Sequence, residues 1–174
     1  ILVGTHKGGF DRFSFNITPY LKSNGSQKIV LAVEDATNFS SQPRGKQQIN
    51  ASGIYYTPVS GIWQTVWLEA VSSESYLKQV KTTTDIEKST VSILPMTNVS
   101  LVKRYKVAVN IFFDEKKVAS GITNPNTPLN LKIDNAQLWS PEHPHLYDVK
   151  MDLINPSGKI IDEVNSYFGM RKIS

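Results

Sequence analysis

Cysteine is absent from the 174 residues, which excludes disulfide bonds and thiolate metal sites. No apolar run approaches the roughly 20 residues that a membrane-spanning helix needs, so we expect no membrane partner. An amphipathic helix would repeat apolar side chains every three to four residues, and no useful length of this chain does so. These absences leave an all-β fold that is held together by packing alone.

Charge of one sign is not concentrated anywhere along the chain. The net charge of +4 arises from 19 Lys and Arg residues scattered singly among 15 Asp and Glu residues. A nucleic-acid-binding face gathers basic residues along one groove, so we expect no nucleic-acid partner. The alternative, single-strand binding on a β-barrel surface, would draw on basic and aromatic residues. His143 and His145 lack a third ligand nearby, and we therefore expect no metal and no cofactor.

The first part of the chain combines strand patterns with one long polar segment. Phe13 to Ile17 alternates apolar and polar side chains, and Ile29 to Val33 is apolar on both faces, as in a central strand. A polar stretch follows from Glu34 to about Gly53, and Val66 to Val71 forms a last strand. Loops of more than ~12 residues are uncommon in compact domains and often functional. We therefore expect the polar stretch to be a functional loop.

A Ser-rich joint at residues 72–75 predicts a boundary between a domain of residues 1–72 and one of residues 73–174. After it, short alternating patterns arrive at regular spacing, separated by turn residues, which is typical of an immunoglobulin-like sandwich. Tyr147 begins a strand after a long connection, and we expect its hydroxyl to bond to backbone as a corner tyrosine does. The expected strands lie near residues 76–83, 89–94, 104–113, 117–122, 129–133, 146–154 and 159–167.

Four segments carry a family resemblance: Gly4 to Phe10, Gly61 to Leu68, Leu138 to Leu153 and Phe168 to Arg171. In this order they resemble the two non-catalytic β-domains that precede the barrel of family-two glycoside hydrolases, the β-galactosidase, β-mannosidase and β-glucuronidase group. The resemblance implies the rear part of a galactose-binding-like jelly roll in residues 1–72, followed by an immunoglobulin-like sandwich. Thr5 is an extra residue in the Gly-His turn of the family.

The resemblance also implies what the chain lacks. The first jelly-roll strands are missing, and so is the TIM barrel on which the family carries its two catalytic glutamates. We assign no catalytic residue and expect the chain alone to be inactive, as a fragment of a retaining, β-galactosidase-like enzyme. The implied partners are a carbohydrate and the missing barrel. By analogy with the family, an exported bacterial enzyme is favoured.

Jelly-roll loops of the family lean over the barrel mouth, which makes the long polar loop the candidate substrate-binding segment. Its side chains offer hydrogen bonds to hydroxyls and rings that stack on a pyranose. The alternative for its charged residues is that they are ordinary solvated loop charges. The candidates are Asp35, Gln42, Arg44, Lys46, Gln47, Tyr55 and Tyr56.

Three tryptophans are candidates for an interface between domains. Trp63 and Trp67 lie an even number of residues apart, which predicts a shared strand face, and Trp139 belongs to the Leu138 to Leu153 segment. The expected function is a non-catalytic piece that scaffolds the barrel and lends loop residues to its sugar pocket. The alternative is a free-standing carbohydrate-binding or adhesive β-module, which would need exposed aromatics on one sheet face.

Overall fold

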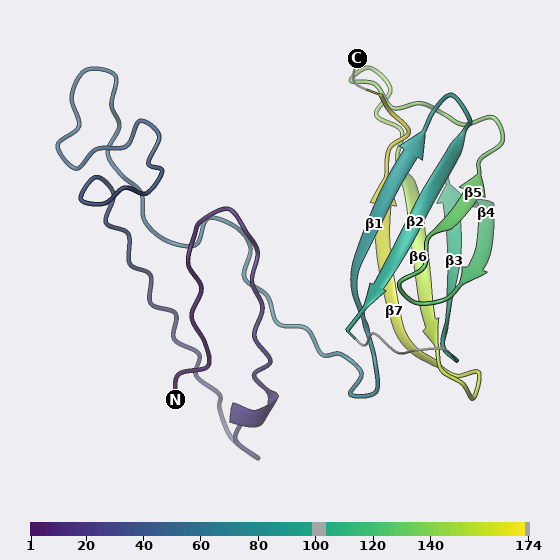
Figure 1. The fold of residues 1–174 in the computed structure, drawn as a ribbon, viewed down its shortest axis with the longest axis horizontal. Coiled ribbons are helices and arrows are strands. Elements are labelled where there is room, and N and C mark those ends of the chain that lie inside the picture. The colour runs from purple at the N-terminus through teal and green to yellow at the C-terminus, as the bar shows by residue number, and fades with distance from the viewer. Residues whose placement is uncertain (99–103, 173–174) are drawn as a thin grey trace. The chain divides into compact units, whose positions relative to one another are not determined.

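The computed structural model describes residues 1–98 and 104–172. The expected second domain, residues 73–174, therefore includes some residues that lie outside the described ones, namely 99–103 and 173–174. The chain divides into two units, Ile1–Leu68 and Glu69–Ser174 (Figure 1). Within the described ranges, no helix has the length and apolar character that crossing a membrane requires.

The second unit is a sandwich of two antiparallel sheets (Figure 1). One sheet has the order β1-β2-β5 and the other β4-β3-β6-β7, so β4 joins the sheet opposite to β5. The prediction of an all-β chain is confirmed, and each expected strand of this unit is present with ends shifted by a few residues. The strands are β1 (Leu77–Asp85), β2 (Thr90–Thr97), β3 (Lys106–Phe113), β4 (Lys116–Thr123), β5 (Leu129–Lys132), β6 (Tyr147–Ile154) and β7 (Ile160–Phe168).

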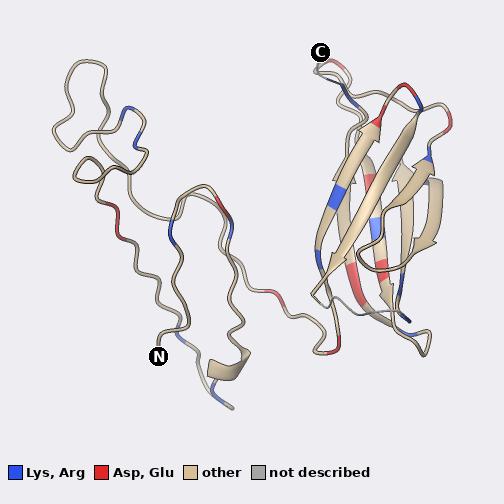
Figure 2. Ribbon diagram, viewed as in Figure 1, with Lys and Arg blue, Asp and Glu red and all other residues tan. Residues whose placement is uncertain are grey.

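Alternation along the strands builds the core between the two sheets. On β6, Tyr147, Val149 and Met151 are buried, whereas the residues between them face outward. Charged residues of both signs are interspersed along the strands of the sandwich (Figure 2). The inner faces of β2 and β3 supply further buried aliphatic side chains, and the core is continuous across both sheets.

The corner before β6 is fixed by the Tyr147 hydroxyl. This hydroxyl accepts a hydrogen bond from the Gln137 N–H at 2.6 Å and donates one to the Gln137 carbonyl at 3.3 Å. Its ring stacks on Phe168 with centroids 5.2 Å apart. The prediction that this hydroxyl bonds to backbone is confirmed, and the corner ties the long connection after β5 to the start of β6.

The first unit does not form the strands that its patterns predict. All of Ile1–Leu68 is described, and it contains the short 3-10 helix η1 (Thr18–Tyr20) but no strand. The expected strands at Phe13 to Ile17, Ile29 to Val33 and Val66 to Val71 are therefore wrong for this structure. A strand needs a neighbour about 4.8 Å away to pair its N–H and C=O groups. Without such neighbours the apolar side chains stay in solvent, and Val30 is 76% exposed.

Candidate functional site

The polar loop of the first unit is organised around the Asp35 carboxylate. Oδ1 accepts hydrogen bonds from the Thr37 N–H at 2.8 Å and from Gln42 Nε2 at 2.5 Å. Oδ2 accepts one from the Ser60 hydroxyl at 3.2 Å. These donors, the Thr37 N–H foremost, lower the pKa of Asp35 because they stabilise its charged form. Asp35 therefore joins the start of the loop, its middle and its exit.

Gln47 makes a second tie between the middle of the loop and its exit. Its Oε1 accepts the Val59 N–H at 2.7 Å, and its Nε2 donates to the Arg44 carbonyl at 3.4 Å. Backbone bonds support the same junction, since the Tyr56 N–H donates to the Lys46 carbonyl at 2.8 Å. Gly45, between the two cations, has φ 59°, a left-handed conformation that glycine adopts without strain. The loop is thus a compact structure with its own hydrogen bonds.

The side chains of the remaining candidates take no part in this framework. Lys46, Tyr55 and Tyr56 are exposed and Arg44 is half-buried. Within residues 1–98 and 104–172, none of these four side chains forms a hydrogen bond or an ion pair. The loop thus presents two cationic groups and two phenol rings, a combination that can bind sugar hydroxyls and stack on a ring.

Sequence patterns identified the loop but not all of its organising contacts. Ser60 and Val59 were not among the candidate residues, although they donate the hydrogen bonds that join Asp35 and Gln47 to the exit of the loop. No local signal marks them, because each contact joins residues that are far apart in the sequence. The structure brings all seven candidate residues into one loop and separates them into a bonded framework and an unbonded set.

Trp63 and Trp67 lie in the first unit and are 72% and 68% exposed. They do not share a strand face, because that segment forms no strand, and this expectation is wrong. The Trp63 indole N–H donates to the Gly9 carbonyl at 2.8 Å, which ties residues at the two ends of the unit's sequence together. Both rings are left available for contact with another surface.

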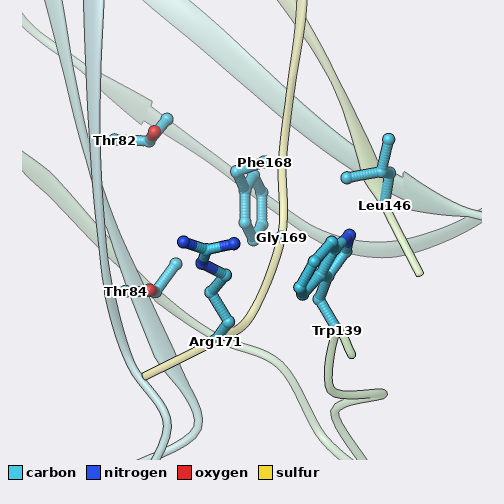
Figure 3. A pocket seen from close by; sticks show the side chains of 7 residues that line it. All are labelled: Thr82, Thr84, Trp139, Leu146, Phe168, Gly169 and Arg171. Atoms are coloured by element: carbon cyan, nitrogen blue, oxygen red, sulfur yellow. The ribbon is translucent and has the colours of Figure 1, made fainter. Parts of the chain in front are cut away.

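Trp139 lies in the second unit beside a groove of about 400 Å³. Its backbone N–H donates to the Met170 carbonyl at 3.0 Å. The Arg171 guanidinium lies over the Trp139 ring, 4.9 Å from the ring centroid (Figure 3). Gly169 lets the backbone lie close to the Trp139 side chain, since a Cβ at residue 169 would be 3.3 Å from the Trp139 Cβ. We name this the Trp139 groove; it is lined by Thr82, Thr84, Trp139, Leu146, Phe168, Gly169 and Arg171.

The second unit contains a pair of neighbouring histidines and, separately, a pair of neighbouring carboxylates. The rings of His143 and His145 stack with centroids 6.0 Å apart, and the described residues contain no group of three or more His, Cys, Asp or Glu suited to a metal. Asp152 lies directly opposite Glu163 in the β6–β7 ladder, on the outer face of the sheet. Burial, foremost, raises the pKa of Asp152, and the neighbouring Glu163 raises it further.

Comparison with known proteins gives matches along most of the chain. The sequence model described as Glycosyl hydrolases family 2 matches residues 65–171. A β-galactosidase from Thermoanaerobacter pseudethanolicus is 26% identical over an alignment of 180 positions, which covers 98% of this chain and 23% of the relative. A putative β-glucuronidase from Formosa agariphila is 30% identical over an alignment of 185 positions, which covers 97% of this chain and 20% of the relative. The chain therefore spans less than a quarter of either relative.

Among solved structures, a β-glucuronidase from Ruminococcus gnavus in complex with D-glucuronic acid matches 58% of this chain and 17% of its own length. The sequence identity is 19% and the TM-score is 0.48.

Proposed function

Because the chain belongs to family 2 of the glycosyl hydrolases, we propose that it is a non-catalytic part of a glycoside hydrolase. In this proposal it scaffolds a catalytic barrel elsewhere in the same polypeptide and lends loop residues to the sugar pocket. The family match carries the proposal, since residues 65–171 include every strand of the sandwich. The names of the relatives favour a β-galactoside or a β-glucuronide as the substrate class.

The carboxyl pair on the β6–β7 ladder, Asp152 and Glu163, does not have the arrangement that retaining hydrolysis needs. Retaining hydrolysis needs two carboxyl groups about 5–5.5 Å apart on either side of a sugar site. Asp152 and Glu163 are neighbours in one ladder on an open sheet face, and Glu163 is held by Lys150 in an ion pair of 2.7 Å. A sugar ring has no place between two side chains that stand side by side on a sheet. In the proposal, the catalytic carboxylates belong to the barrel.

The loop supplies the proposed carbohydrate contacts. Arg44 and Lys46 flank Gly45, and both can donate hydrogen bonds to sugar hydroxyls. Tyr55 and Tyr56 add phenol rings, of which Tyr56 is 66% exposed. A framework of hydrogen bonds behind these groups favours a binding role over that of solvated charges, because ordered donors lose less entropy when a ligand binds.

The tryptophans support the proposed scaffold role. Interfaces are enriched in Trp and Arg, whose large flat groups bury much area at low entropic cost. The Trp139 groove presents such a pair, and Leu146 at its edge is 46% exposed. We propose that this groove packs against the barrel, and that Trp63 and Trp67 form a further interface.

The test uses the complete gene product and chromogenic β-galactoside, β-glucuronide and β-mannoside substrates. Arg44→Ala and Lys46→Ala should raise KM about tenfold for the accepted glycoside, with a smaller change in kcat, since each removes about one charged hydrogen bond. Lys28→Ala is the matched control, because Lys28 is an exposed cation of the same unit outside the loop. Unchanged kcat/KM for every glycoside in both loop variants would contradict the proposed pocket role.

A free-standing carbohydrate-binding module is the second candidate, favoured by the exposure of Trp63 and Trp67. Titration of the chain with mono- and oligosaccharides separates the two. Quenching of tryptophan fluorescence with a millimolar or tighter Kd would favour the module, because the barrel would not be needed. Absence of binding by the chain, together with activity of the complete gene product, would favour the scaffold.

A further inference from the structure

The loop residues fall into two chemically different sets. The carboxylate of Asp35 offers about four lone-pair sites, and three are used by Thr37, Gln42 and Ser60. The amide of Gln47 is engaged at both ends, its oxygen by the Val59 N–H and its nitrogen by the Arg44 carbonyl. Most of the hydrogen-bonding capacity of Asp35, and both polar atoms of the Gln47 amide, are thus used inside the loop.

The two ties act on the same turn. Asp35 holds Gln42, which lies just before the turn, and Gln47 follows it directly. The Nε2 group of Gln47 also donates to the carbonyl of Arg44 itself. The backbone that carries Arg44 and Lys46 is therefore fixed from both sides, while the two cationic side chains remain unbonded within the described residues.

We propose that Asp35 and Gln47 are positioning residues, which hold the Arg44–Lys46 turn in place for a sugar without contacting the sugar themselves. The proposal deepens the proposed function and rests on it. A loop closed only by its backbone would sample many conformations, and ordering it on binding would lower the affinity. The lowered pKa of Asp35 agrees with a carboxylate that stays charged and bonded.

Limited proteolysis measures how strongly the hydrogen bonds of Asp35 and Gln47 hold the turn closed, and it needs no sugar substrate. Trypsin cleaves after Arg44 and after Lys46, and cleavage requires the loop to open. In the complete gene product, Asp35→Asn and Gln47→Ala should each speed cleavage at these two bonds about tenfold. The neutral amide of Asn accepts weaker hydrogen bonds than the carboxylate does, and Ala makes none, so opening the loop costs less free energy. Glu34→Gln is the matched control, an exposed neighbouring acid with no partner among the described residues, and its cleavage rate should not change. Unchanged cleavage in both variants would overturn the proposal.

A double-mutant cycle separates positioning from direct contact. If Asp35 acts through the two cations of the turn, adding Asp35→Asn to the Arg44→Ala/Lys46→Ala variant leaves kcat/KM unchanged, since neither cation remains to be positioned. Multiplying losses would instead mean that Asp35 binds the sugar itself, which would overturn the proposal. Gln47→Glu keeps the acceptor for the Val59 N–H. Its KM should therefore lie well below the raised KM of Gln47→Ala.

The two proposals fail in different ways. If Arg44→Ala and Lys46→Ala both leave kcat/KM unchanged, the proposed pocket role of the loop falls, and the sugar-positioning role of Asp35 falls with it. Faster tryptic cleavage in Asp35→Asn would still support the ties as the elements that order the turn. If Arg44→Ala raises KM but Asp35→Asn changes neither the rate of tryptic cleavage nor KM, the pocket role stands and the positioning role is overturned.

Discussion

Replacing Tyr147 by Phe removes one hydroxyl from the corner of the sandwich and leaves the packing in place. Tyr147 is 1% exposed, and its ring contacts with Phe168 at 5.2 Å and with Phe113 at 5.0 Å do not involve the hydroxyl. The lost interactions are the bond from the Gln137 N–H at 2.6 Å and the bond to its carbonyl at 3.3 Å. A neutral hydrogen bond contributes about 0.5–1.5 kcal/mol, and a partner left unsatisfied costs more. The expected loss in the free energy of unfolding is therefore about 1–3 kcal/mol.

Urea denaturation of the chain, followed by far-ultraviolet circular dichroism, measures this loss. The midpoint should fall while the m-value stays constant, because the surface exposed on unfolding does not change. Tyr167→Phe is the matched control: Tyr167 is 67% exposed on β7, and its substitution should shift the midpoint little. If both variants shift the midpoint equally, or if Tyr147→Phe has no effect, the hydroxyl does not hold the corner and the reasoning is refuted.

Three further changes test the sandwich, each through the free energy of unfolding. Asp152→Asn should raise the free energy of unfolding at neutral pH, because the raised pKa of Asp152 means that ionisation disfavours the native state. This gain should shrink as the pH falls toward 3.8, the usual pKa of an aspartate. A gain that is equal at all pH values would contradict this origin. Glu115→Gly should stabilise by about 0.5–1 kcal/mol, since Glu115 has φ 64° in the β3–β4 turn and glycine adopts that conformation without strain; a loss would refute it. Met151→Ala should lower the free energy of unfolding by about 2–5 kcal/mol, because Met151 is 0% exposed and the surrounding core cannot close the cavity. A denaturation midpoint equal to that of the wild type would show that the core closes the cavity.

The strands of the second unit show what local patterns can predict. Alternation over Val107, Val109 and Ile111 marks one buried face of β3, and all three are buried in the sandwich. Such a signal survives because a strand between two paired neighbours has one face turned to the core. The strand ends were less well predicted, since a strand ends where its hydrogen bonds to the neighbouring strand end rather than where the apolar pattern does.

The same kind of pattern failed in the first unit. Ile29 to Val33 has the composition of a central strand, yet it pairs with nothing in this structure. Strand formation depends on a partner, and the partner of a central strand is distant in sequence. Alternation therefore predicts which segments are able to pair, whereas pairing itself is a property of the assembled sheet.

The candidate site divides in the same way. Local patterns were enough to predict the all-β class, the seven successive strands of the sandwich and the location of the polar loop, because period-two alternation and turn residues are read over short stretches. The folded chain was needed to reveal that Asp35 meets Ser60, that Gln47 meets Val59, and that Arg171 lies over Trp139. These contacts join residues far apart in the chain, and no local pattern encodes which distant groups will satisfy one another's hydrogen bonds.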